Sequence, residues 1–159
     1  MCILIALSVC GLRTVQQNRT WKNNVTLWEH NLKINPDSFI ANRNLGNHYT
    51  RNGDHERALA YYRELTRAYP ELSISWNTSA RAARRLQRTG EAIGYYKNAI
   101  IALERNNFRS WRLRTEYADY LNAIGNTSEA LSEYQAIIAK EPPNMKKLEE
   151  KVESLRMRL

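Results

Sequence analysis

A fixed internal spacing of 34 residues is the feature that most constrains the fold of this chain. Pro36 and Pro70 are 34 residues apart, and each follows an apolar-periodic stretch, as expected for a proline just beyond a helix end. The run Ala58-Leu59-Ala60-Tyr61-Tyr62 returns 34 residues later as Ala92-Ile93-Gly94-Tyr95-Tyr96, and a third copy, Ala130 to Tyr134, follows after 38. A period of this length predicts stacked helical hairpins. The four additional residues are expected to lengthen the second hairpin or its exit loop near Asn106-Asn107.

Within this period, small and aromatic residues recur at matching positions. The first full unit has Leu45-Gly46 and Tyr49 on its first helix, Gly53 in the turn, and Ala58 and Tyr62 on its second helix. The pattern resembles the tetratricopeptide repeat, in which small residues allow two helices to approach and aromatic residues fill the space between hairpins. Matches in the later units are Trp76, Ala80, Ala92, Tyr96, Ala99, Tyr117-Ala118, Gly125, Ala130, Tyr134 and Pro142. The second unit departs from the family pattern at Ser79, Ala83 and Glu104.

The resemblance implies an all-α, right-handed solenoid of antiparallel helix pairs. The expected units are a half repeat at 21–36, repeats at about 39–72, 73–106 and 111–143, and a capping helix at 144–159. In the capping segment one apolar stripe repeats at intervals of three and four residues, opposite a charged face. The stripe consists of Met145, Leu148, Val152, Leu155 and Leu159. Such a helix can cover the last hairpin on one side and face water on the other.

Residues 1–20 form a separate apolar segment and junction. Met1 to Leu12 carry no charge, but twelve helical residues span roughly 18 Å, less than the about 30 Å of a bilayer core. Three interpretations stay open: part of a membrane span, a signal peptide, or an apolar helix packed on the first hairpin. Arg13, Asn18, Arg19, Trp21, Leu27, Trp28 and Pro36 are similar to the junction between the last span and the repeats of multi-pass transmembrane-and-tetratricopeptide, O-mannosyltransferase-like proteins. This resemblance implies repeats on the extracytoplasmic side of a membrane; without it, a cytoplasmic position is the alternative.

No catalytic or metal-binding motif is present in the sequence. His55-Glu56 begins a zinc-protease pattern, but Leu59 stands where the second histidine is required. The six glycines are dispersed, so no phosphate-binding loop is expected. We therefore expect no enzyme activity, no cofactor and no metal. Tyr61-Tyr62 and Tyr95-Tyr96 are interpreted as core packing residues. Four Asn-x-Ser/Thr sequons, at Asn18, Asn24, Asn77 and Asn126, are acceptors only if the chain meets the glycosylation machinery.

The resemblance also implies a ligand groove lined by the first helix of each hairpin. The candidate groove residues are Arg43, Asn47, Asn77, Arg81, Arg84, Arg85 and Arg112, with Thr50, Thr115, Asp119 and Asn122 beside them. Arg81, Arg84, Arg85 and Arg88 have helical spacing and predict a basic stripe able to bind carboxylates. Arg43, Asn47 and Arg112 also fall at positions of a known two-carboxylate clamp. Thr78 and Glu116 depart from that clamp, and Glu116 argues against it.

The net charge of +8 favours an acidic partner. The leading hypothesis is a non-enzymatic, membrane-associated scaffold that binds an acidic protein or peptide. The alternatives are a self-assembling oligomer or filament subunit, and the soluble tail of a membrane glycosyltransferase-like protein. Nucleic acid is disfavoured because the base-stacking signatures of common RNA-binding modules are absent.

Overall fold

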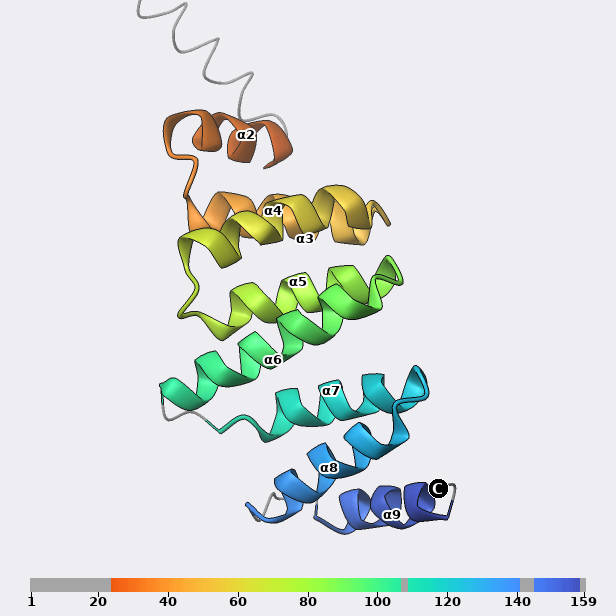
Figure 1. The fold of residues 1–159 in the computed structure, drawn as a ribbon. Helices are drawn as coiled ribbons and strands as arrows, with labels where there is room; N and C mark the ends of the chain where they lie inside the picture. The colour runs from red at the N-terminus through yellow and green to blue at the C-terminus, as the bar shows by residue number, and fades with distance from the viewer. Residues whose placement is uncertain (1–23, 107–108, 141–144, 158–159) are drawn as a thin grey trace, which may run out of the picture. The chain divides into compact units, whose positions relative to one another are not determined.

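The computed structural model describes residues 24–106, 109–140 and 145–157, and within these ranges all regular structure is helical. The chain divides into two compact units, Met1–Tyr69 and Pro70–Leu159. Eight helices, α2 to α9, lie in the described ranges (Figure 1). The calls on residues 1–20, including a partial membrane span, lie outside the described residues.

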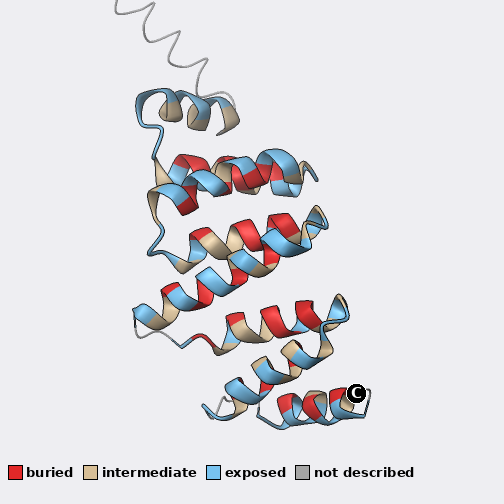
Figure 2. Ribbon diagram, viewed as in Figure 1, coloured by how far each residue is buried: buried red, intermediate tan, exposed pale blue. Residues whose placement is uncertain are grey.

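The first unit contains α2 (Asn24–Ile34), α3 (Phe39–Arg51) and α4 (His55–Ala68), with α3 and α4 side by side as a hairpin (Figure 1). Each helix of this hairpin begins at a capping side chain: Ser38 accepts a hydrogen bond from the amide of Ala41, and Asp54 from that of Arg57. The buried residues of the hairpin lie on the facing sides of the two helices (Figure 2). They include Ala41, Leu45, Gly46, Ala58, Leu59, Tyr62 and Leu65.

The second unit contains two hairpins and a final helix. Its helices are α5 (Ser73–Arg85), α6 (Thr89–Arg105), α7 (Trp111–Ala123), α8 (Thr127–Ile138) and α9 (Met145–Arg156). Its largest fully buried side chains include Tyr96, Tyr117, Tyr134 and Leu121, so the repeated tyrosines form the core. Tyr62 and Tyr96 are buried as predicted, whereas Tyr61 and Tyr95 are half-buried. The 38-residue spacing coincides with a 17-residue α6, compared with 14 residues in α4.

Helix α9 packs against α8 through the predicted apolar stripe. Leu148, Val152 and Leu155 are buried, whereas Met145 at the start of the helix is 39% exposed. Leu159, the last residue of the stripe, lies outside the described residues.

The three hairpin turns share one backbone position in the left-handed region. Gly53 has φ +76° and Gly125 has φ +84°, but the α5–α6 turn has Gln87 there, with φ 57°. A residue with a Cβ pays roughly 1–2 kcal/mol in this conformation, whereas glycine adopts it without strain. The middle hairpin therefore carries strain that the other two avoid.

Replacing Gln87 with glycine is expected to raise the free energy of unfolding by about 0.5–1 kcal/mol. The gain is the relieved strain minus the larger entropy that glycine loses on folding. Urea unfolding followed by circular dichroism measures the change. The reciprocal variant Gly53→Gln serves as the control and is expected to be destabilised by a similar amount. A lower stability for Gln87→Gly would contradict the prediction.

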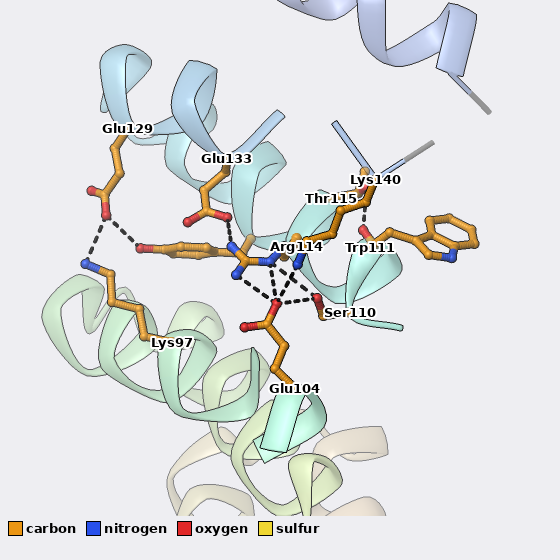
Figure 3. A network of polar contacts seen from close by, with 10 residues as sticks. Lys97, Glu104, Ser110, Trp111, Arg114, Thr115, Glu129, Glu133 and Lys140 are labelled. Atoms are coloured by element: carbon orange, nitrogen blue, oxygen red, sulfur yellow. Dashed lines mark hydrogen bonds and ion pairs between the residues drawn. The ribbon is translucent and has the colours of Figure 1, made fainter. Parts of the chain in front are cut away.

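A half-buried ion network joins α6, α7 and α8 (Figure 3). The Arg114 guanidinium donates to Glu104 at 3.0 Å and to Glu133 at 2.5 Å. Ser110 Oγ donates to the same Glu104 oxygen at 2.9 Å, and Lys140 Nζ donates to it at 3.2 Å. Burial opposes ionisation of Glu104, but the hydrogen bonds from Arg114, Ser110 and Lys140 outweigh it and hold the pKa of Glu104 below its ordinary value. Arg114 thereby fixes α7, which carries half of the candidate site, between two neighbouring helices.

Candidate functional site

The predicted groove residues of the first unit lie on α3, and one of them is used internally. Asn47 Oδ1 accepts a hydrogen bond of 2.9 Å from the Tyr62 hydroxyl, which also lies 3.1 Å from Thr50 Oγ1. The exposed Arg43 has its guanidinium 6.0 Å from the centre of the Phe39 ring. Asn47 therefore orients Tyr62, while Arg43 remains at the surface.

In the second unit, the predicted residues of α5 and α7 meet in one cluster. Arg81 Nε lies 3.3 Å from Glu116 Oε1, and the same oxygen accepts a 3.0 Å hydrogen bond from the hydroxyl of Tyr96 on α6. Arg84 lies beside α7 as well, with its guanidinium 5.9 Å from the centre of the Tyr120 ring. We call this cluster of Arg81, Arg84, Glu116 and Tyr120 the α5–α7 face.

Tyr96 supports this face from below as a permanently neutral hydrogen-bond donor. Its side chain is fully buried, and its ring lies 5.8 Å from that of Tyr120. Burial, followed by the negative charge of Glu116, raises the pKa of Tyr96 far above its ordinary value of 10.0. The hydroxyl therefore stays protonated throughout the physiological range and keeps Glu116 in place beside Arg81.

The charge of the α5–α7 face differs from a uniform basic stripe. Glu116 compensates Arg81, and Arg84 is half-buried against Tyr120. Arg85, one helical turn after Arg81, is exposed and forms no ion pair within the described ranges. Arg112 is also exposed and lies with its guanidinium 5.1 Å from the centre of the Trp111 ring. Arg85 and Arg112 are thus the arginines best placed to receive an external anion.

Two residues of the predicted stripe are placed differently from the expectation. The prediction that Arg88 continues the stripe on the same helix is wrong, because α5 ends at Arg85 and Arg88 is the N-cap residue of α6. Asn77 lies on α5, but its Oδ1 atom is buried and has no hydrogen-bond partner among the described residues. The Asn77 oxygen is therefore not on the accessible surface.

The polar side of α7 continues into a hollow of about 290 Å³ beside α9. Asp119 and Asn122, both predicted from the sequence, line this hollow together with Tyr134 and Lys151. The Asp119 carboxylate accepts hydrogen bonds from Lys151 and from the Tyr134 hydroxyl. Sequence reasoning missed Tyr120 and Lys151. Their helical position relative to Glu116 and Leu148 is the signal that could have indicated them, because residues three or four apart share a helix face.

The described residues show neither a metal cluster nor a membrane span. They contain no group of three or more His, Cys, Asp or Glu side chains arranged to hold a metal ion. Every helix within these ranges is too short or too polar to traverse a bilayer. His48 is engaged with a neighbouring side chain, since its Nε2 lies 2.9 Å from Asn52 Nδ2.

Comparison with known sequences identifies the repeat. Residues 28–73 match a family model of the tetratricopeptide repeat. The chain is also 27% identical over 99 residues to the human protein O-mannosyl-transferase TMTC3. That alignment covers 62% of this chain but only 11% of the human protein, so the chain spans about a tenth of its relative's length.

Comparison with solved structures confirms the predicted all-α repeat fold. The crystal structure of MamA superposes with a TM-score of 0.70 at 13% identity, covering 88% of this chain and 79% of MamA. The TPR2B domain of yeast Sti1, solved in complex with pHsp70, superposes with a TM-score of 0.60 at 21% identity, covering 74% of this chain and 95% of the domain. The chain is therefore a helical repeat protein that carries tetratricopeptide repeats, by sequence over residues 28–73 and by fold over its described helices.

Proposed function

We propose that this chain is a non-enzymatic scaffold that binds a protein or peptide through the α5–α7 face. The proposal is supported by the similarity to the TPR2B domain of yeast Sti1, which was solved with pHsp70. It is carried by one observation on this chain: Arg85 and Arg112 are exposed and have no acidic partner within the described ranges, beside an α5–α7 face already held in position by Tyr96.

The ligand that this surface favours is an acidic peptide. A guanidinium can donate two parallel hydrogen bonds to a carboxylate, and such charge-assisted pairs are stronger than neutral ones. The net charge of +8 adds a long-range attraction for an anionic partner. Glu116 stands between the arginines of α5 and the start of α7, so a carboxylate is favoured near Arg85 or Arg112 and repelled near Arg81.

Reversing the charge of Arg85 tests the proposal. The probe is a fluorescent pool of peptides containing Asp and Glu, compared with a pool in which Asn and Gln replace them. The full chain is expected to bind the acidic pool preferentially, and Arg85→Glu is expected to weaken this binding about tenfold or more, equivalent to one charge-assisted contact.

Arg105→Glu is the matched control. Arg85 and Arg105 are both exposed arginines in the last turn of a helix, α5 and α6 respectively, so the two variants change net charge and helix-end electrostatics equally. Binding of the acidic pool should be weakened only by the first variant. Equal affinities of the two variants, or equal binding of the acidic and amide pools, would reject the α5–α7 face. A single-stranded oligonucleotide that competes at the same site would favour nucleic acid as the ligand.

We further propose that the repeats lie on the extracytoplasmic side of a membrane, as a small part of a longer membrane protein. The similarity to TMTC3 and the apolar residues 1–12 support this position. Protease protection of the chain in sealed microsomes tests it. Digestion of the repeats without detergent would place them in the cytoplasm instead.

A further inference from the structure

The turn between α7 and α8 presents a glycosylation sequon at the surface. The sequon Asn126-Thr127-Ser128 starts at the N-cap residue of α8, directly after Gly125. The Asn126 side chain is exposed and makes no capping hydrogen bond, and Ser128 is exposed as well. We propose that Asn126 is an N-glycosylation acceptor of this chain. The inference rests on the proposed extracytoplasmic position and is independent of peptide binding.

The second sequon within the described ranges has the opposite environment. Asn77 lies inside α5, and its Oδ1 atom is buried. Ser79, which supplies the required hydroxyl two residues later, is 0% exposed and donates a 3.1 Å hydrogen bond to the carbonyl of Ser75. A bulky glycan on Asn77 is therefore incompatible with the packed helix, whereas one on Asn126 extends into solvent.

The modification follows directly from the accessible amide. The Asn126 side-chain nitrogen attacks the anomeric carbon of a lipid-linked oligosaccharide, supplied by the host's glycosylation machinery. A C–N bond forms, the C–O bond to the lipid diphosphate breaks, the diphosphate leaves with the electron pair, and the amide nitrogen loses one proton. Because the Asn126 side chain caps nothing, the glycan removes no hydrogen bond from α8.

The test uses the full chain behind a cleavable secretion signal, with a reporter sequon in a C-terminal tag that records entry into the secretory compartment. In the first variant, Asn18, Asn24 and Asn77 are replaced with Gln, which leaves Asn126 as the only sequon of the chain. We expect two endoglycosidase-sensitive mobility shifts, one from the tag and one from Asn126. Adding Ser128→Ala should remove the second shift and leave the first. A single shift in the variant that retains Asn126 would overturn the proposal.

A companion variant retains Asn77 and replaces Asn18, Asn24 and Asn126 with Gln. Its monomeric, helical fraction is isolated by gel filtration and checked by circular dichroism. This folded fraction is expected to carry the tag glycan only. A folded fraction that also carries a glycan on Asn77 would show that burial does not distinguish the two sequons, and would overturn the structural argument.

Discussion

Replacing Arg114 with methionine is expected to lower the free energy of unfolding by about 2–4 kcal/mol. The Arg114 side chain is only 17% exposed, and it pairs with Glu104 at 3.0 Å and Glu133 at 2.5 Å. Methionine keeps much of the apolar volume but leaves two carboxylates close together without their common cation. Removing one member of a buried pair costs roughly 3–5 kcal/mol, and the partial exposure of Glu104 reduces this figure.

Urea unfolding at neutral pH measures the loss, with Arg105→Met as the control. Arg105 is exposed and forms no ion pair in the described ranges, so its replacement is expected to change stability by less than about 0.5 kcal/mol. Adding Glu133→Gln to Arg114→Met should recover part of the loss, because it removes one of the uncompensated charges. Equal stability of the Arg114→Met and Arg105→Met variants would show that the network contributes nothing.

The difference between wild type and Arg114→Met should also depend on pH. The folded-state pKa of Glu104 lies below the ordinary value of 4.5 that it regains on unfolding. Its contribution is therefore complete above about pH 4.5 and is lost as the pH falls through the folded-state pKa. Acidification below this range should narrow the gap between the two proteins. A gap that stays constant would mean that Arg114 acts through packing alone.

The sequence predicted the helices and the repeated core because both depend on local periodicity. Gly46, Ala58, Tyr62 and Tyr96 recur at the same repeat positions, and each is buried in the fold. The spacing alone places these residues at helix–helix contacts, without knowledge of which atoms meet.

The polar contacts of the candidate site could not be predicted in the same way. Arg81 and Glu116 are 35 residues apart, and their contact depends on how two hairpins pack. Glu116 was interpreted only as a departure from a carboxylate clamp, whereas in the structure it orients Arg81 and accepts from Tyr96. The Arg114 network likewise depends on the 17-residue α6, whose last turn carries Glu104. Pairings of this kind are set by tertiary geometry, so no period in the sequence indicates them.

Replacing Gly46 with alanine is expected to destabilise the first unit by about 2–4 kcal/mol. A Cβ atom at this position would lie 2.8 Å from both Cδ1 and Cζ of Tyr62, and closer still to Cε1. The Tyr62 ring is 3% exposed, and its hydroxyl is bonded to Asn47 at 2.9 Å. The ring must therefore shift, at a cost of roughly 1–3 kcal/mol for overpacking and about 1 kcal/mol for each weakened hydrogen bond. The higher helix propensity of alanine offsets about 1 kcal/mol of this.

Gly94→Ala is the matched control, because Gly94 lies inside α6 and no atom comes within 4 Å of its added Cβ. Alanine there should stabilise the chain by roughly 0.5–1 kcal/mol, so the same substitution has opposite signs at the two sites. Thermal and urea unfolding measure both. In a Tyr62→Leu background the cost of Gly46→Ala should largely disappear, since the ring that causes the clash is absent. If the cost persists in that background, the helix backbone at Gly46, and not the tyrosine packed against it, requires glycine.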